Sequence, residues 1–453
     1  MKFVRILGRQ PEGRTQEEGM ASLRSSSLFF SLLASSAVVA APPSAVVVQP
    51  LSSGAGVSWR LSNANGSVSV PGSVPGAAHL DLLRAGLAGE LYAALNVDAL
   101  AWVAGEDWTY TATFTAEAAL LAAPSAELVA EGIETVAAVS LNGVPLWTST
   151  SAFRRMSADV TRLLRAGAGA HALVVAIASP LAAAAANFAA CTGWCPPLSS
   201  SANETAAVGV TSLRAPPVSF GWDFAPHAVG SGIWRPIFLR GYAGAALDEV
   251  TVITTPAALP VPRGDGVPAA WKADFVAWAT GAAPAGAAVT VEVAIDELAL
   301  RASGRGSVAA GPWGGAVAVS LAVPAALAWW PAGLGAPRLY NATVTLTADG
   351  GSTSVRTLEI GFRHTQLDQP PAPNGGAGSL YIFAVNGVRL YVKGANWVRC
   401  TAPAPPPPSP PPPRRRCRSA RVAYPCRPSY APLPRSALAL LPRRCPRTPF
   451  RRA

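Results

Sequence analysis

Charged residues are scarce in this sequence. Asp, Glu, Lys and Arg make up 13% of its 453 positions, whereas apolar residues make up 50%. A chain of this composition can bury a substantial core, which excludes a disordered polar polymer. After the N-terminal segment, no apolar run is long enough to cross a bilayer as a helix. The sequence therefore predicts a globular protein of two to four domains with no transmembrane segment.

Acidic residues are absent from the last part of the chain. Residues 401–453 contain twelve arginines, no lysine and no Asp or Glu. The whole chain has 36 basic and 25 acidic residues, so residues 1–400 hold 36 − 12 = 24 basic and 25 acidic ones. The net charge of +11 is thus a property of the tail, and the body is nearly neutral. This distribution argues against nucleic acid as a partner of the body.

Metal-binding patterns are also missing. The six cysteines and four histidines form no group with the spacing of metal ligands, so neither a metal nor a cofactor is predicted. Cys191 and Cys195 lie four positions apart, and either a disulfide between them or two free thiols fits that spacing. A structural role is expected for each of the scattered histidines, His79, His171, His227 and His364.

The N-terminal segment is typical of a secretory signal. Arg24 supplies the basic start, and a largely apolar run of 14 residues follows from Leu28 to Ala41. The polar stretch before Met20 suggests that Met20 is the true start. We therefore expect the secretory pathway, with a lysosome or vacuole or the extracellular space as destination. Sequons for N-glycosylation, which fit this route, begin at Asn65, Asn203 and Asn341.

Most of the chain after residue 50 reads as short strands separated by turn residues. The Asn-Gly pairs at 142–143 and 386–387 favour the positive φ angles of tight hairpins. One short helix is expected at 77–87, with Leu80, Leu83 and Leu87 on one face. Because helices are not interleaved with the strands, the pattern predicts antiparallel sandwiches. The expected strands are 108–114, 137–147, 171–179, 248–256, 288–295, 316–324, 339–350 and 352–362.

Six segments of the chain contain distinctive motifs. They are "SWRLSNANGSVSVPGSVPGAAHLDLLRAGL" from Ser58, "LNVDALAWVAGEDWTYTATF" at 95–114, "SFGWDFAPHAVGSGIWRPIFLRGY" at 219–242, "WWPAGLGAPRLY" at 329–340, "IGFRHTQL" at 360–367 and "NGVRLYVKGANWV" at 386–398. In this order they resemble the N-terminal half of β-mannosidases of glycoside hydrolase family 2. The segment at 219–242 is similar to the family's "FGWDWGP…GIWRPV" signature.

The resemblance implies an all-β fold with a fixed order of domains. A jelly-roll-like, galactose-binding-like sandwich is followed by an immunoglobulin-like sandwich and by the first strand of a truncated (β/α)8 barrel. The expected ranges are 1–44 for the pre-segment and signal peptide, 45–245 and 246–366 for the two sandwiches, 367–399 for the linker and first barrel strand, and 400–453 for a disordered Pro/Arg-rich tail.

The activity implied by the resemblance is retaining hydrolysis of terminal, non-reducing β-D-mannose. Its substrates would be β-mannoside oligosaccharides or N-glycan remnants, and two glutamates of the barrel would carry the chemistry. Only 55 residues follow Val398, and none of them is Asp or Glu. We therefore assign no catalytic residue and expect an inactive fragment. The alternative is a secreted, non-catalytic carbohydrate-binding or cell-wall protein.

The resemblance also implies sugar-contacting residues. Trp222 and Asp223 match a loop that contacts the terminal mannose, although Phe224 and Ala225 replace the family's Trp-Gly. An indole can stack on a pyranose and a carboxylate can accept from its hydroxyls. The other interpretation of this pair is a core tryptophan beside a turn aspartate.

Three further residues are candidates by the same resemblance. Arg214 either orients the carboxylate of Asp223 or is a plain surface residue. Asn396 and Trp397 would line the active-site end of a complete barrel. Packing roles are expected for Trp234, Trp329 and Trp330.

Two explanations fit the tail. The run "APPPPSPPPP" at 404–413 is typical of a rigid polyproline II spacer, here followed by arginines suited to an anionic surface. Alternatively, a GC-rich intron or a shifted reading frame would produce the same excess of Pro, Arg, Ala, Ser and Cys. The abrupt change after "GANWV" favours the second explanation.

Overall fold

The computed structural model describes residues 45–395, except 55, 94, 168, 194–211, 222–226, 264–265, 283–285 and 350. The signal segment, the start at Met20 and the Pro/Arg-rich tail lie outside the described residues, as does the sequon residue Asn203. The predictions made for them therefore stay predictions.

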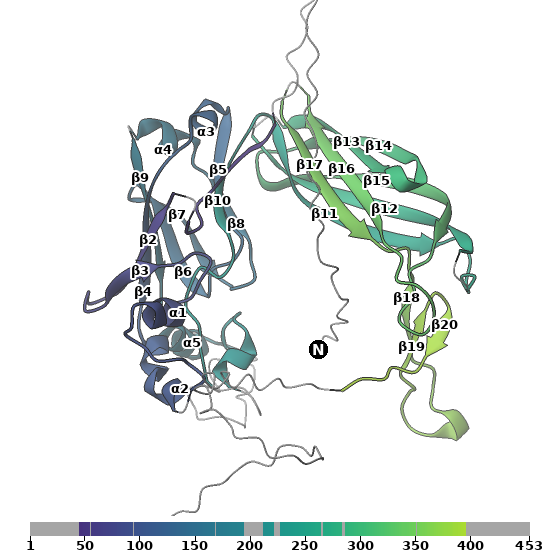
Figure 1. Cartoon of the computed structure of the whole chain (residues 1–453), viewed down its shortest axis with the longest axis horizontal. Coiled ribbons are helices and arrows are strands. Elements are labelled where there is room, and N and C mark those ends of the chain that lie inside the picture. Colours follow the sequence, from purple (N-terminus) through teal and green to yellow (C-terminus); the bar gives the residue numbers. More distant parts are fainter. Residues whose placement is uncertain are drawn as a thin grey trace, which may run out of the picture. The chain divides into compact units, whose positions relative to one another are not determined.

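Two antiparallel sheets form the first sandwich (Figure 1). One has six strands in the order β3-β2-β4-β9-β6-β7, and the other has four in the order β1-β10-β5-β8. The strands are β1 Val47–Pro50, β2 Ser58–Asn63, β3 Ser69–Gly72, β4 Trp108–Thr115, β5 Ser125–Ala130, β6 Val136–Leu141, β7 Val144–Thr150, β8 Met156–Asp159, β9 Ala170–Ile177 and β10 Ile237–Tyr242.

Alternation along the strands builds the core of this sandwich. In β4, residues Trp108, Tyr110, Ala112 and Phe114 are buried, and the residues between them are half-buried or exposed. The strand β9 repeats the pattern and pairs with β4 along its whole length. Because successive side chains of a strand point to opposite faces, every second residue enters the core. The strands expected at 108–114 and 171–179 are confirmed.

Short helices cover the ends of the first sandwich. The helix expected at 77–87 is present as α1, although Leu80 and Leu87 are 47% and 57% exposed. The helix buries Asp81 and Leu82, and the Tyr110 hydroxyl donates to Asp81 Oδ2 at 3.1 Å. The helices are α1 Ala78–Arg84, α2 Asn96–Ala99, α3 Ala118–Ala122, α4 Thr161–Ala166 and α5 Pro180–Ala189, with 3-10 turns at Ala101–Gly105, Pro217–Phe220, Asp296–Leu298 and Pro373–Gly375.

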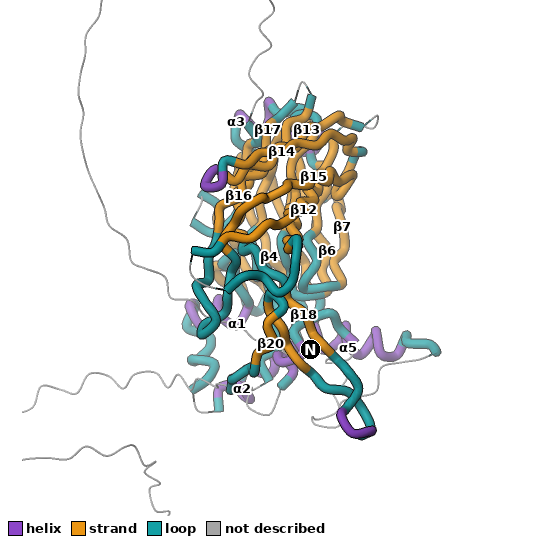
Figure 2. The backbone as a smooth tube through the Cα atoms, turned by 90° about the vertical axis from the view of Figure 1, so that its right-hand side faces the viewer, coloured by secondary structure: helices purple, strands orange, loops and turns teal. Residues whose placement is uncertain are grey.

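The second sandwich consists of a three-stranded sheet, β11-β12-β15, and a four-stranded sheet, β14-β13-β16-β17 (Figure 1). Figure 2 shows its strands β12 to β17 from another side. All of its strand pairs are antiparallel. The five strands expected here are confirmed, and β12 and β14 are additional. The bounds are β11 Ala245–Pro256, β12 Pro268–Gly281, β13 Ala287–Ile295, β14 Leu300–Val308, β15 Gly311–Leu327, β16 Tyr340–Ala348 and β17 Thr353–Ile360.

A small sheet of β18 (Thr365–Asp368), β19 (Ile382–Val385) and β20 (Val388–Leu390) follows the second sandwich. The turn between β19 and β20 has φ angles of 54° at Asn386 and 79° at Gly387, as the Asn-Gly pair predicts. The strand β20 pairs antiparallel with β19. Of the segment expected to begin a barrel, the residues from 396 onward lie outside the described part.

The described chain is an all-β protein of sandwiches, as predicted. Among the helices that the structure describes, none is long and apolar enough to cross a membrane.

Candidate functional site

The residues predicted to contact sugar are mostly outside the described structure. This holds for Trp222, Asp223, Asn396 and Trp397, so their roles remain predictions. Arg214 is described, and its side chain is exposed. Its carbonyl oxygen accepts a hydrogen bond from the Ala152 N–H at 2.9 Å. The plain surface interpretation of Arg214 thus agrees with its exposure.

The two ends of the 222–226 loop are held together by the surrounding backbone. The Ala228 N–H donates to the Ser219 carbonyl at 2.9 Å, and Phe220 is 1% exposed in a small apolar cluster. Gly221 has a φ of 104°, and a Cβ there would lie 2.4 Å from Cδ2 of His227. Only glycine fits this position without strain. The chain therefore enters and leaves the loop at a well-packed point.

A buried carboxylate lies beside the segment that follows this loop. Glu134 exchanges two backbone hydrogen bonds with Gly232, at 2.8 and 3.3 Å. Its Oε1 atom is buried without a hydrogen-bond partner among the described residues. Burial raises the pKa of this carboxyl above its ordinary value. A Cβ at Gly230 would lie 2.7 Å from Glu134 Oε2, so glycine permits the close approach.

Two hydroxyls next to Glu134 are buried as well. Thr135 and Ser231 are 2% and 1% exposed, and neither side-chain oxygen has a hydrogen-bond partner within the described ranges. The Ser231 carbonyl accepts from the Ala78 N–H at 2.9 Å, which ties this segment to the start of α1. The sequence analysis did not predict this cluster. The Gly-Ser-Gly run at 230–232 was the available signal for close packing.

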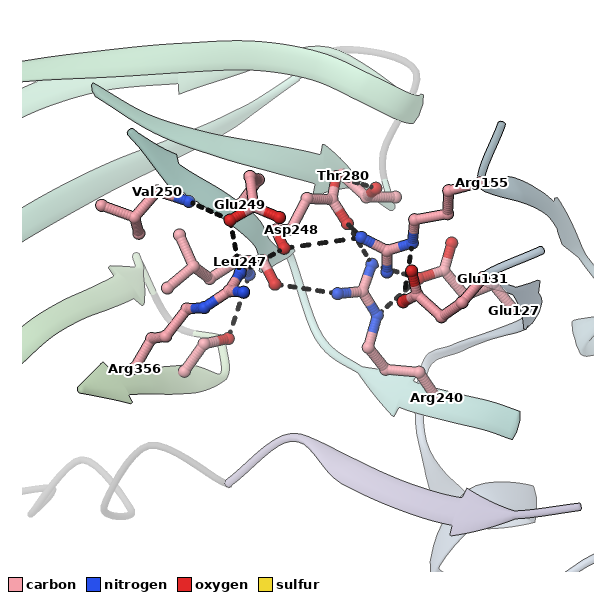
Figure 3. Close-up of polar contacts among 11 residues, drawn as sticks. Glu127, Glu131, Arg155, Arg240, Leu247, Asp248, Glu249, Val250, Thr280 and Arg356 are labelled. Atoms are coloured by element: carbon pink, nitrogen blue, oxygen red, sulfur yellow. Dashed lines mark hydrogen bonds and ion pairs between the residues drawn. The ribbon is translucent and has the colours of Figure 1, made fainter. Parts of the chain in front are cut away.

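The largest polar network of the described chain joins the two sandwiches (Figure 3). Arg240 of β10 donates from Nη2 to Asp248 Oδ1 of β11 at 2.7 Å and from Nε to Glu127 of β5. The other oxygen of Asp248 accepts from the Thr280 hydroxyl at 2.6 Å. Burial alone would lower the pKa of Arg240, but the charges of Glu127 and Asp248 outweigh it and raise the pKa.

Two further arginines extend this network. Arg155 Nη1 lies 3.5 Å from Asp248 Oδ1, and its Nε lies 3.4 Å from Glu131 Oε1. Arg356 Nη1 lies 3.1 Å from Glu249 Oε1. A cavity of about 730 Å³ adjoins these residues. Because most of its charged groups neutralise one another, the arrangement is suited to holding the sandwiches together rather than to binding an ion.

The acids of the junction network are bound to arginines, which makes them unsuited to act as the acid and the nucleophile of glycoside chemistry. Glu131 and Asp248 are bound to Arg155, and Glu292 forms an exposed ion pair with Arg301 at 2.9 Å. In the described part of the chain, no group of three or more His, Cys, Asp or Glu residues could hold a metal ion.

The remaining predictions about single residues have mixed outcomes. His171 is 1% exposed and stacks near Phe114, which confirms a structural role. Trp330 is 3% exposed and lies in the core, as expected, whereas Trp329 also lines a surface cavity. Cys191 is disulfide-bonded, and every other cysteine of the chain lies outside the described residues.

The exposed sequon residues add one more observation. Asn65 lies in a turn and Asn341 at the start of β16, and both are exposed to solvent. Exposure is required for a glycan at either position, and glycosylation itself stays a prediction.

Two family models match these sandwiches. Residues 59–235 match the model described as the glycosyl hydrolase 2 galactose-binding domain-like domain, and residues 272–363 match the model of glycosyl hydrolases family 2. These matches show that the chain carries the galactose-binding-like and immunoglobulin-like domains found at the N-terminal side of glycoside hydrolase family 2.

Curated relatives narrow the resemblance to β-mannosidases. The chain is 28% identical over 349 residues to the β-mannosidase of Rattus norvegicus. The alignment covers 75% of this chain and 38% of the relative. It is 29% identical over 380 residues to β-mannosidase A of Aspergillus aculeatus, with 76% and 38% covered. The chain thus spans less than two fifths of the length of these relatives.

Solved structures agree on the fold. The β-D-mannosidase of Dictyoglomus thermophilum superposes with a TM-score of 0.64 at 23% identity, covering 78% of this chain and 40% of that one. The exo-chitosanase CsxA of Amycolatopsis orientalis gives a TM-score of 0.55 at 16% identity, with 78% and 37% covered.

Proposed function

We propose that this chain forms the N-terminal domains of an enzyme that hydrolyses terminal, non-reducing β-D-mannose residues with retention of configuration. The observation that carries the proposal is the homology to β-mannosidases over about three quarters of the chain. Retention requires two carboxyl groups about 5 Å apart, one as acid and base and one as nucleophile. We place both outside the sandwiches, because acids such as Glu131, Asp248 and Glu292 are engaged in ion pairs with arginines.

In this proposal the first sandwich supplies substrate contacts from its 222–226 loop. Trp222 would stack on the apolar face of the mannose, and Asp223 would accept hydrogen bonds from its hydroxyls. The bond between Ser219 and Ala228 supports the loop at its base. A loop closed in this way loses less conformational entropy when it binds sugar.

We further propose that the protein enters the secretory pathway and acts in a lysosome or vacuole or outside the cell. The signal-like segment and the exposed residues Asn65 and Asn341 support this location. The substrates would then be β-mannoside oligosaccharides or remnants of N-glycans.

The experiment compares two proteins with p-nitrophenyl β-mannoside as substrate. One is the chain of 453 residues, and the other is the product obtained by reading the transcript past the codon for Val398. We expect turnover by the second protein alone, with mannoside preferred over the matching galactoside and glucuronide. If no barrel with two candidate glutamates lies downstream, or if another glycoside is preferred, the proposal fails.

A variant of the longer protein tests the role of the loop. Asp223→Asn is expected to lower kcat/KM for the mannoside by about 10- to 100-fold, because a charge-assisted hydrogen bond is lost. Asp349→Asn, at an exposed turn of the second sandwich, is the matched control and should leave kcat/KM unchanged. Equal effects of the two substitutions would refute a role for Asp223 in substrate contact.

The second candidate function is a non-catalytic carbohydrate-binding protein. It is favoured by one observation, namely that the described residues form only sandwiches, a small sheet and short helices. This second function predicts that the transcript is translated into the 453-residue chain. It also predicts that the chain binds manno-oligosaccharides without turnover. A downstream barrel would exclude it.

A further inference from the structure

A surface cavity lies on the second sandwich, at its junction with the small sheet. Its volume is about 460 Å³, which is in the range of small-molecule sites. The polar and aromatic residues that line it come from β11, β17, β18 and the segments beside them. They are Thr254, Trp329, Glu359, Arg363, His364 and Thr365.

One buried asparagine fixes two walls of this cavity. Asn386 is 0% exposed, and its N–H donates to the His364 carbonyl at 2.7 Å. Its Oδ1 accepts from the His364 N–H at 2.8 Å, and its Nδ2 donates to the Trp329 carbonyl at 3.0 Å. The backbones of Trp329 and His364 are therefore held in place before any ligand arrives.

A second set of bonds fixes the wall formed by Arg363. The Thr254 hydroxyl donates to the Arg363 carbonyl at 3.0 Å and accepts from the Arg363 N–H at 3.3 Å. The guanidinium carbon of Arg363 lies 4.7 Å from the centre of the Trp329 ring. The stacking limits the rotamers of Arg363, so that its N–H groups are presented in a defined direction.

The charges that line the cavity are available to a ligand. Glu359 and Arg363 are both exposed, and neither forms an ion pair with another residue in the described ranges. This contrasts with the junction network of Figure 3, where arginines and acids bind one another. The cavity thus offers a carboxylate acceptor, a guanidinium donor and the hydroxyl of Thr365 beside an indole.

We propose that this cavity is a saccharide-binding subsite that takes a neutral pyranose, separate from the 222–226 loop. Vicinal hydroxyls of a sugar can donate to a carboxylate and accept from a guanidinium at the same time. The apolar side of the sugar ring suits the exposed side chains of Ile253 and Leu339, which line the same cavity. Glu359 disfavours an acidic sugar, because its charge would face a second carboxylate.

The position of Asn341 determines how the experiment is set up. This sequon residue pairs with Glu359 across β16 and β17, so a glycan there would begin beside the cavity. The 453-residue chain is therefore used in deglycosylated form. It is titrated with β-1,4-mannobiose and with a digalacturonate of the same length, and heat release is measured by calorimetry.

The expected result is binding of mannobiose that weakens about tenfold in Glu359→Gln and in Arg363→Gln. Both residues are exposed, so these variants should fold. Arg305→Gln, at an exposed position of the same sandwich, is the control and should bind as the unchanged chain does. The proposal is overturned by no binding, by binding of the digalacturonate alone, or by equal affinity in all variants.

A last variant separates this inference from the proposed function. Binding at the cavity should persist in Trp222→Ala. If binding is lost in Trp222→Ala and unaffected in Glu359→Gln, the cavity is not a subsite, while the role of the loop in the proposed enzyme stands.

Discussion

Arg240 of β10 and Asp248 of β11 form a buried ion pair at 2.7 Å that links the end of the first sandwich to the start of the second. Both side chains are less than 10% exposed, and Glu127 and Thr280 complete their hydrogen bonds (Figure 3). A buried charge is tolerated only when it is paired and hydrogen-bonded. The pair therefore makes the connection between the sandwiches a specific one.

Asp248→Ala should destabilise the protein strongly. It leaves Arg240 buried with one carboxylate in place of two, and we expect the free energy of unfolding to fall by about 3–5 kcal/mol. Chemical denaturation followed by tryptophan fluorescence measures the change. The control is Asp296→Ala, which breaks an exposed ion pair with Arg301 and should cost less than about 1 kcal/mol. Similar losses in both variants would show that the network does not stabilise the junction.

Gly232→Ala should disrupt the segment between α1 and Glu134. A Cβ there would lie 2.4 Å from the Gly76 carbonyl oxygen, and backbone atoms cannot move aside cheaply. We expect a loss of about 1–3 kcal/mol in the free energy of unfolding, measured by thermal denaturation. At Gly105 a Cβ would meet nothing within 4 Å, so Gly105→Ala is the matched control. An unaltered melting temperature of Gly232→Ala would contradict the close packing of Gly232 against Gly76.

The titration of Glu134 should make the stability of the folded protein fall as the pH rises. Burial raises its pKa in the folded state, so the folded protein holds this proton more tightly than the unfolded chain does. Its contribution to stability is therefore greatest at low pH and is lost as the pH rises from the ordinary value of 4.5 to the raised one. Glu134→Gln should melt at a higher temperature than the unchanged protein at about pH 7, and the difference should vanish near pH 4. A difference that stays constant over this range would exclude titration of Glu134 as its cause.

Asn386 should be needed for the attachment of the small sheet. Asn386→Ala removes the side-chain bonds to His364 and Trp329 and also strains a position with a φ of 54°. Asn386→Gly removes the same bonds without the strain. We expect losses of about 1–3 kcal/mol for the glycine variant and more for alanine, measured by denaturation. If the glycine variant is as stable as the unchanged chain, the side-chain bonds contribute nothing.

The strands predicted from the sequence have alternating apolar residues, whereas several others, β12 and β14 among them, were missed, β14 for a physical reason. The strand β14, "LRASGRGSV", contains Gly304 and Gly306 and reads as a turn. A Cβ at Gly306 would lie 2.8 Å from a methyl carbon of Val317, so glycine is needed there for close packing on β15. Local composition cannot distinguish such a strand from a loop, because the neighbour that requires glycine lies on another strand.

The same limit applied to α1. The sequence placed Leu80, Leu83 and Leu87 on one face, but it did not indicate that Asp81 is buried, where its carboxylate accepts a hydrogen bond from Tyr110 of a distant strand. Buried polar groups depend on partners that are remote in sequence. The cluster at Glu134 and the network at Arg240 could not be predicted for this reason.

By itself, the sequence determined the all-β class, the two hairpin turns at Asn-Gly pairs and the order of family segments, because these depend on local periodicity and on φ preferences. The tertiary structure alone decided which charges pair and which stay available. Arg240 and Asp248 neutralise each other at the junction, whereas Glu359 and Arg363 line a cavity with neither in an ion pair among the described residues. Each outcome depends on which strands pack side by side, and this is set by the whole core rather than by any one segment.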